Sequence, residues 1–309
     1  MKTLLKKFSF ENVTGIYSLD RLMYVLDEDL VEIKNIAESS KSFYKPKREL
    51  KGTKVRKIDR PFGRLKDVQQ KIDNTILKKV PVPEHMYGSV TGKTIQDNAK
   101  LHLKQKVVVS IDLRDCFPNT DNNLVYAVFR ERLRYSKSVS NLLTKLTTVD
   151  MYVPQGAPTS STLVNIILTP LYNTLESYAN DHGLRLSFWV DDIILSGDKA
   201  HDHINNAILI IQQFGYRVRG KKIKIMMRGK SSQEVTGVSV NGRLSVPKKK
   251  LEKYTDEVYE YFKTKIISLE MEASIQGKIG YVKYVDKKKA QRLQKIFDHM
   301  SKQSAHIMG

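Results

Sequence analysis

The chain has 309 residues, with 53 Lys or Arg against 33 Asp or Glu, and therefore a formal net charge of +20. Because 40% of its residues are hydrophobic, we expect a folded globular protein whose polyanionic partner is nucleic acid. No apolar run is long enough to span a membrane, so no membrane partner is expected, and the single cysteine excludes an internal disulfide and fits a reducing cytoplasm.

Two amphipathic helices are predicted in the N-terminal third, over residues 18–37 and 65–79, from apolar side chains at helical spacing. Between them, residues 41–66 contain eleven Lys or Arg and only two acidic residues. Such a basic loop is either a solvated face or a nucleic-acid contact, and the sequence favours neither interpretation. Within it, a short strand places Lys54 and Arg56 on one face, where both could meet a triphosphate.

A short helix is predicted to begin near Thr94, after the glycine-punctuated turn of residues 87–93. This turn lacks the full spacing of a phosphate-binding loop, so it is only weak support for a phosphate site. Inside the helix, Asn98 and His102 lie one turn apart on the same face. Considered alone, a histidine of this kind is more often a structural residue than a ligand.

Carboxylates are placed beside predicted strands at two points of the chain. A β-branched run ends at Asp112, and two apolar runs flank Asp191 and Asp192, which predicts a β-hairpin with these two acids at its tip. An isolated Asp-Asp pair is typical of a solvated loop, but a second acidic strand end would let three carboxylates converge. Neighbouring carboxylates repel each other unless a cation neutralises them, and oxygen ligands without a Cys/His cluster favour Mg²⁺ over zinc.

The remaining helices of the central region are predicted from apolar periodicity. They cover residues 121–134, 136–147, 160–180 and 201–214. Two prolines and one glycine define the loop of residues 152–159, which leads into the third of these helices. This loop is either a simple helix lead-in or a segment whose backbone and Gln155 abut a base-paired template strand.

The C-terminal part of the chain is basic. Residues 216–230 contain no acid and could place a cation beside a triphosphate. Residues 234–246 are predicted to form a hairpin, because Asn241-Gly242 is the sequence typical of a type I′ turn. Helices rich in Lys and Tyr follow, consistent with a small domain that grips a duplex or a structured RNA, and residues 304–309 are expected to be a frayed tail.

The order of three of these stretches resembles that of the palm of reverse transcriptases. They are the strand that ends at Asp112, the loop Pro154-Gln155-Gly156-Ala157-Pro158-Thr159-Ser160 and the hairpin Val190-Asp191-Asp192. Two further elements are similar to those of bacterial retron reverse transcriptases. Asn98-Ala99-Lys100-Leu101-His102 resembles the Asn-Ala-x-x-His element of that group, and Val235-Thr236-Gly237 resembles its Val-Thr-Gly element.

The resemblance covers about residues 54–247, and the chain departs from the family pattern at two places. Trp189-Val190 stands where the family commonly has Tyr-Ala, and Ser161 stands where it commonly has proline. Neither departure changes the acidic residues. Both bear on fidelity, on contact with the primer strand and on the retron subtype.

The resemblance implies a fold of the α+β class, the right-hand polymerase fold. Residues 1–105 would be mainly fingers, and residues 106–246 would be the palm, an antiparallel sheet that carries the acids, with interspersed helices. Residues 247–309 would form a small helical thumb.

The resemblance also implies roles for individual residues. Asp112, Asp191 and Asp192 would be the catalytic acids and would hold two Mg²⁺ ions, an arrangement suited to in-line phosphoryl transfer. Phe117 matches the bulky position that excludes a ribonucleotide 2′-OH, and Lys222 would protonate or neutralise the leaving group. The residues expected to contact the incoming deoxynucleoside triphosphate are Lys54, Arg56, Phe117, Gln155 and Lys222.

Finally, the resemblance implies an RNA-directed DNA polymerase that copies a structured non-coding RNA. This RNA would be the template and would also supply a guanosine 2′-OH as primer, giving a branched RNA–DNA product, with an effector protein as partner in defence against phage. The residues expected to bear on recognition of this RNA are Asn98, His102, Val235, Thr236 and Gly237. Two alternatives stay open: another bacterial reverse transcriptase of the defence or intron type, and a catalytically silent RNA-binding scaffold.

Overall fold

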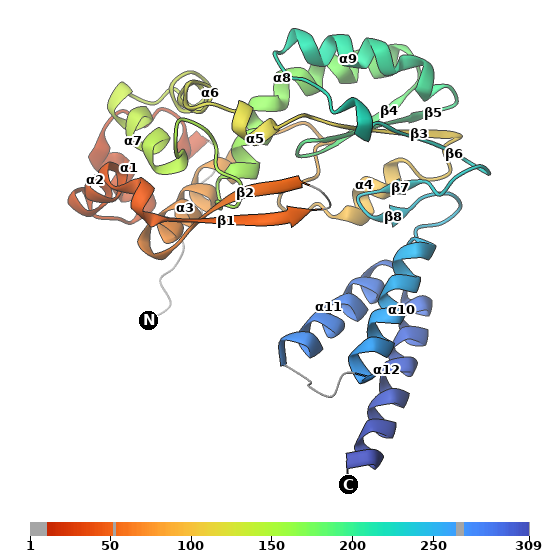
Figure 1. The fold of residues 1–309 in the computed structure, drawn as a ribbon. Coiled ribbons are helices and arrows are strands. Elements are labelled where there is room, and N and C mark those ends of the chain that lie inside the picture. Colours follow the sequence, from red (N-terminus) through yellow and green to blue (C-terminus); the bar gives the residue numbers. More distant parts are fainter. Residues whose placement is uncertain (1–10, 52–53, 264–268, 309) are drawn as a thin grey trace.

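The computed structural model describes residues 11–51, 54–263 and 269–308 (Figure 1). It consists of a helical region built mainly from the N-terminal third, a central sheet with helices on one face, and a C-terminal bundle of helices. In the N-terminal region, α7 packs against α1, α2 and α3. The helices of this region are α1 (Leu19–Leu26), α2 (Leu30–Glu38), α3 (Gly63–Thr75), α6 (Asn122–Ala127) and α7 (Lys137–Thr147), with short helical turns at Glu11–Val13, Ser40–Phe43, Leu77–Lys79 and Val128–Arg132.

The single helix predicted over residues 18–37 is wrong, because the chain forms two helices there. Asp27 adopts a left-handed conformation with φ +56° and ends α1, and its backbone N–H donates to the Met23 carbonyl. The Asp29 carboxylate then accepts a hydrogen bond from the Glu32 N–H and caps α2. Asp tolerates the left-handed region better than most residues, and the apolar spacing continues across the break, so the pattern alone does not reveal it.

The basic segment before α3 forms a β-hairpin. β1 (Tyr44–Lys51) pairs antiparallel with β2 (Lys54–Pro61) over their whole length. The predicted basic loop is therefore wrong for most of these residues, although the short predicted strand lies within β2. Lys54 and Arg56 belong to β2, but their side chains lie outside what the structure describes.

The central sheet has four antiparallel strands in the order β4-β5-β3-β6. Its members are β3 (Val107–Asp112), β4 (Arg185–Trp189), β5 (Asp192–Gly197) and β6 (Lys224–Met227). Side chains alternate across β3, so that Val107 and Val109 join one apolar core and Val108 joins a second. The sheet therefore separates a large core, shared with the helices, from a smaller core shared with the C-terminal bundle.

Helices α8 and α9 run along one face of the sheet (Figure 1). The predicted helix over residues 160–180 is confirmed as α8 (Ser160–Asp181), and α9 (Ile204–Gln213) follows the short turn Ala200–His203. Two further short helices, α4 (Ile95–Leu101) and α5 (Cys116–Asn119), flank β3 in the chain. The predicted start of α4 near Thr94 is confirmed, since Thr94 and Asp97 form a capping box.

A small hairpin, β7 (Glu234–Val235) and β8 (Val238–Ser239), links the sheet to the bundle. The prediction that Asn241-Gly242 forms its turn is wrong. The turn is Thr236-Gly237, with φ of +46° and +81°, as a type I′ turn requires. Asn241 instead uses its side chain, which accepts from the Gln233 N–H and donates to the Ser231 carbonyl.

The C-terminal bundle consists of α10 (Lys248–Lys263), α11 (Leu269–Val285) and α12 (Lys287–Met308) and projects away from the sheet (Figure 1). The predicted frayed tail is wrong as far as Met308, where α12 ends. Among the described helices, none combines the length and the apolar character that crossing a membrane requires.

Candidate functional site

The acidic residues meet at one end of the sheet. Asp112 is the last residue of β3, and Asp192, the first residue of β5, is its direct partner in the antiparallel register. Trp189 pairs with Asp192, so Val190-Asp191 form the two-residue turn of the β4–β5 hairpin. The predicted acidic hairpin is confirmed, with Asp191 in the turn and Asp192 at the start of the strand. We name this hairpin, residues 185–197, the acidic hairpin.

The segment before α4 supports the acidic hairpin by direct contact with its turn. Val190 has φ +57°, which a β-branched residue adopts only where its surroundings enforce it. Gly88 lies against this turn so closely that a Cβ atom there would be 2.7 Å from Val190 Cγ2 and 2.9 Å from the Val190 N atom. The Tyr87 N–H donates to the Phe188 carbonyl, and Asn165 donates to the Gly88 carbonyl. The sequence suggested a weak phosphate site here, whereas the structure shows a support for the turn.

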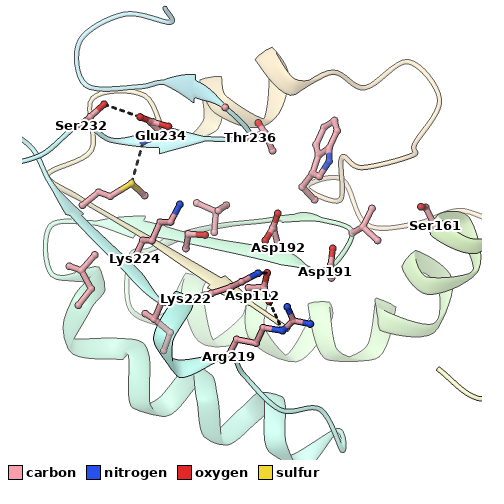
Figure 2. Close-up of a pocket in the computed structure, with 18 of the residues that line it drawn as sticks. Asp112, Ser161, Asp191, Asp192, Arg219, Lys222, Lys224, Ser232, Glu234 and Thr236 are labelled. Carbon is pink, nitrogen blue, oxygen red and sulfur yellow. Dashed lines mark hydrogen bonds and ion pairs between the residues drawn. The ribbon is translucent and has the colours of Figure 1, made fainter. Parts of the chain in front are cut away.

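Two basic side chains contact Asp112 (Figure 2). Lys222 Nζ lies 2.9 Å from Asp112 Oδ2, and Arg219 Nε lies 3.3 Å from Asp112 Oδ1. Arg219 also forms an ion pair with Asp115. The sequence placed a cation from residues 216–230 near the site but did not assign Arg219; the absence of acids in that stretch was the only signal for it.

The surroundings of Asp192 change the titration of its carboxyl group. Burial is the largest cause that raises its pKa to about 6, and the neighbouring charges of Asp191 and Asp112 raise it further. Lys222 and Lys224 act in the opposite direction. A carboxylate ionises less readily beside like charges, so Asp191 and Asp112 disfavour the charged form of Asp192. The cluster is therefore a place where added positive charge is stabilising.

The donor atoms of the cluster fit a divalent cation by their chemistry. They are carboxylate oxygens, which Mg²⁺ prefers. Asp112 Oδ1 is buried and accepts no hydrogen bond from the described residues, although it forms an ion pair with Arg219. Within the described ranges, however, no three His, Cys, Asp or Glu side chains are already grouped closely enough to hold a metal. A cation would thus draw the acids together and compete with Lys222 for Asp112.

The acids line a cavity of about 1170 Å³, which also reaches Thr236 and Gly237 at the β7–β8 turn (Figure 2). A second cavity of about 610 Å³ adjoins it. Phe117, Ser161 and Asp191 line both cavities, so Asp191 lies where the two spaces meet, and Asp112 and Asp192 line the larger cavity alone. An elongated substrate could therefore extend from one cavity into the other past the acids.

The loop before α8 forms one wall of the second cavity. Gln155 is half-buried and lines this cavity together with Arg60 and Lys66. Gly156 has φ +107°, and a Cβ atom there would lie 2.9 Å from Ile58 Cγ2 of β2. Only glycine allows this approach, so the loop packs directly on the β1–β2 hairpin. The sequence did not reveal Arg60 or Lys66 as cavity residues, because both come from the hairpin and helix of the N-terminal region.

The residues predicted to bear on RNA recognition divide into two groups. Asn98, His102 and Val235 are fully buried, so none of them presents a surface that RNA could touch. Thr236 and Gly237 are half-buried and line the larger cavity. A direct contact with nucleic acid is therefore open only to the second group.

Comparison with known proteins supports a family for this chain. Residues 45–252 match the family model described as "Reverse transcriptase (RNA-dependent DNA polymerase)". The chain is 34% identical to the retron Se72 reverse transcriptase of Salmonella heidelberg (strain 579083-10) over 194 residues, which is 61% of this chain and 50% of that protein. It is 28% identical to the retron Mx65 reverse transcriptase of Myxococcus xanthus over 260 residues, 77% of this chain and 60% of the relative. The chain thus spans between half and three fifths of the length of these relatives.

Among solved structures, a telomerase from Candida albicans aligns with 84% of this chain and 56% of its own, with a TM-score of 0.49 and 11% identity. This likeness is too distant to support an inference about substrates or partners. The family match therefore rests on the sequence.

Proposed function

The chain belongs to the reverse transcriptase family, and from that premise we propose that it is an RNA-directed DNA polymerase of the retron type. Its curated relatives are retron reverse transcriptases, so the resemblance predicted from the sequence motifs is confirmed. The observation that supports catalysis most directly is the register of the sheet. It brings Asp112 opposite Asp192, beside the turn whose Asp191 lies at the junction of two cavities.

We assign the three regions of the chain to the parts of a right-hand polymerase. Residues 1–105 are mainly fingers, residues 106–246 are mainly palm, and residues 247–309 are the thumb. The contacts of α7 with α1, α2 and α3 support the inclusion of fingers-type helices within the palm segment. Most of the second apolar core comes from residues 235–297, and Ala99, Val108, Ile194 and Met226 complete it from α4 and the sheet, which supports a thumb that packs on the palm.

In this proposal Asp112, Asp191 and Asp192 hold divalent cations, expected to be two Mg²⁺ ions. When bound, such ions lower the pKa of the primer hydroxyl and neutralise charge on the leaving pyrophosphate. Asp112 already carries two cationic neighbours, Lys222 and Arg219. These side chains neutralise part of the charge of Asp112 until a cation takes their place.

The chain's own residues then select and orient the nucleotide. Phe117 lies at the junction of the cavities, where its ring would occupy the space beside the sugar and exclude a 2′-OH. Gln155 and its loop would contact the template base pair from the second cavity. Lys222 would neutralise or protonate the leaving group once it is released from Asp112. Lys54 and Arg56 of β2 would bind the triphosphate.

The proposed template is a structured non-coding RNA, which also supplies a guanosine 2′-OH as primer. The net charge of +20 supports a large polyanionic partner, and the lysines of α10 and α12 supply much positive charge in the bundle. The product would be single-stranded DNA joined to RNA through a branch. An effector protein would complete the system in defence against phage.

A primer-extension assay tests the polymerase activity. Purified protein is incubated with a primed RNA template, Mg²⁺ and deoxynucleotides, beside Asp191→Asn and the control Asp198→Asn. Asp198 lies just beyond the other end of β5 and is well exposed, paired with Lys106, so it matches the change in charge without touching the site. We expect extension by the wild type and the control and none by Asp191→Asn. Equal extension by all three proteins would remove the assignment of the acids.

A separate measurement tests the retron type. Nucleic acid that co-purifies with the protein is sequenced, and its DNA is examined for a 2′–5′ branch by treatment with a debranching enzyme. A single structured RNA linked to DNA supports the proposal. Extension of primed templates without any such RNA would leave a polymerase of another bacterial class.

A further inference from the structure

We propose that His102 is a positioning residue for the acidic hairpin, which it ties to α4 through one hydroxyl group on each strand. This inference rests on the proposed function, because the acids it would position are the proposed catalytic acids. It assigns to the Asn-Ala-x-x-His element a structural task at the active site in place of a direct contact with RNA.

The contacts of the imidazole are complete and entirely internal. His102 follows the last turn of α4 and is fully buried. Its Nδ1 atom lies 2.7 Å from Ser196 Oγ of β5, and its Nε2 atom lies 2.8 Å from Ser187 Oγ of β4. Both serines are also fully buried. No solvent or nucleic acid can reach any of the three groups without unfolding this part of the protein.

The positions of the two serines explain why this contact would fix the hairpin. Ser187 is paired with Ile194 in the register, and Ser196 is paired with Arg185, so the two hydroxyls lie on a diagonal across β4 and β5. A slip of one strand by one residue would turn one hydroxyl to the opposite face and break its bond. The ring therefore holds both strands at once, a few residues from the turn that contains Asp191.

The charge state of the ring matches this arrangement. Burial is the largest cause that lowers the pKa of His102 to about 3, and the nearby charges of Arg185 and His85 lower it further. The neutral imidazole has one N–H donor and one acceptor nitrogen, so one serine accepts a hydrogen bond and the other donates one. Every polar atom of the contact is satisfied, which a buried polar cluster requires.

The helix that carries His102 is itself held at both ends. The Thr94–Asp97 capping box closes its N-terminus, and Thr236 Oγ1 contacts the Ile95 carbonyl there. At the other end, Arg185 Nη1 of β4 donates to the Leu101 carbonyl at 2.7 Å. Because α4 is fixed to the β7–β8 turn and to β4, it can act as a rigid support from which His102 holds the hairpin.

The test compares Ser187→Ala/Ser196→Ala and His102→Asn with the control Ser140→Ala. Ser140 lies in α7 and is equally buried, and its hydroxyl group has no hydrogen-bond partner among the described residues. Its replacement therefore removes a buried hydroxyl group at a site away from the acidic hairpin. Circular dichroism first identifies a temperature at which every variant is folded. At that temperature we measure kcat and KM for deoxynucleotides, the affinity for RNA in EDTA, and Mn²⁺ binding by electron paramagnetic resonance.

We expect kcat to fall by about ten- to a hundredfold in Ser187→Ala/Ser196→Ala and in His102→Asn, because a misplacement of a catalytic group by about 1 Å can lower the rate about a hundredfold. Mn²⁺ binding should weaken in the same variants, while RNA affinity in EDTA and all properties of Ser140→Ala stay within about twofold of the wild type. A role confined to stability would lower the melting temperature without changing kcat of the folded protein.

Two results would overturn the proposal. One is an unchanged kcat and an unchanged Mn²⁺ affinity in the folded double serine variant and in folded His102→Asn. The other is a loss of RNA affinity in EDTA that accounts for the whole loss of activity, because it would return His102 to RNA recognition. If the wild type makes no DNA, the proposed function fails, and the Mn²⁺ measurement alone still decides whether His102 positions the acids.

Discussion

Asp112 of β3 and Asp192 of β5 face each other directly across two antiparallel strands. Like charges in directly opposed positions destabilise a sheet, so this pair weakens the fold where it occurs. The surroundings offset part of the repulsion. Lys222 and Arg219 form ion pairs with Asp112, and the carboxyl group of Asp192 keeps its proton to a higher pH than usual. Local instability of this kind is typical of a site that binds positive charge.

The first prediction concerns the stability of the metal-free protein as a function of pH. The pKa of Asp192 is about 6 in the folded state and 3.8 in its unperturbed state. The folded protein therefore binds more protons than the unfolded chain between about pH 4 and 6, and the free energy of unfolding should fall as the pH rises through this window. The penalty at higher pH is at most about 3 kcal/mol.

Urea denaturation in EDTA at pH 4.5 and pH 8 measures this effect. Asp192→Asn cannot ionise, so its stability relative to wild type should increase between the two pH values. Asp198→Asn removes an exposed carboxylate beyond the opposite end of β5 and should show no such gain. A pH response that is the same in wild type and Asp192→Asn would contradict the prediction.

The second prediction is that Lys222 competes with metal for Asp112. Lys222→Met removes the ammonium that lies 2.9 Å from Asp112 Oδ2. Since the lysine is partly exposed, the ion pair is worth no more than about 1 kcal/mol, and Mn²⁺ binding should tighten by up to about fivefold. The rate of nucleotide incorporation should fall nevertheless, because the leaving group loses its cation.

Lys221→Met is the matched control, since Lys221 is exposed and does not line the cavity. Calorimetric titration with Mn²⁺ measures the affinity, and single-turnover extension measures the rate. Weaker metal binding in Lys222→Met than in Lys221→Met would show that the lysine supports the site and does not compete for it.

The sequence was sufficient to predict the local features of the site. The acidic hairpin and the strand that ends at Asp112 each depend on residues adjacent in the chain, and apolar periodicity reveals both. The segment that carries Lys222 was also predicted to bring a cation to the site. Its partner Asp112 lies 110 residues away, however, and no local pattern specifies that pairing.

The features that could not be predicted depend on tertiary contacts. The Asn241-Gly242 pair has the stronger local turn signal, yet Thr236-Gly237 forms the turn, because Tyr281 of α11 donates a hydrogen bond to the Gly237 carbonyl and holds it. The serine partners of His102 lie 85 and 94 residues away. A buried histidine could be proposed from the sequence, but its role at the acidic hairpin could not.

The third prediction concerns the support under the Val190-Asp191 turn. Gly88→Ala would place a Cβ atom 2.7 Å from Val190 Cγ2 and 2.9 Å from its backbone N atom, so the turn must move. We expect a loss of about 1–3 kcal/mol in stability and a fall in kcat of about tenfold or more.

Gly277→Ala is the control for this change. Gly277 lies in α11, and among the described residues beyond the glycine's chain neighbours and the nearby backbone of that helix, no atom lies within 4 Å of the position that a Cβ atom would take there. Alanine should therefore stabilise the helix by about 0.5–1 kcal/mol and leave kcat unchanged. Chemical denaturation and primer extension measure the two quantities. Wild-type activity in Gly88→Ala would show that the turn does not depend on this contact.

The fourth prediction concerns the attachment of the C-terminal bundle. The Tyr281 hydroxyl donates to the Gly237 carbonyl at 2.6 Å, and the ammonium of Lys250 lies 4.1 Å from the centre of the Tyr281 ring. Tyr281→Phe keeps the ring and its contact with Lys250 but leaves the Gly237 carbonyl without this donor. Because a half-buried hydrogen bond of this kind contributes about 1 kcal/mol, we expect a similar loss of stability.

Tyr281→Phe should also weaken RNA binding if the orientation of the C-terminal bundle sets the affinity for RNA. Tyr284→Phe is the control, since Tyr284 lies on the same helix with its side chain half exposed. Fluorescence anisotropy with a labelled structured RNA in EDTA, at a temperature where all proteins are folded, measures the affinity. We expect Tyr281→Phe to bind the RNA several-fold more weakly than Tyr284→Phe does. Without the hydrogen bond to Gly237, the basic helices can adopt orientations that do not fit the RNA. Equal affinities would show that the Gly237 contact stabilises the fold without setting the position of the bundle.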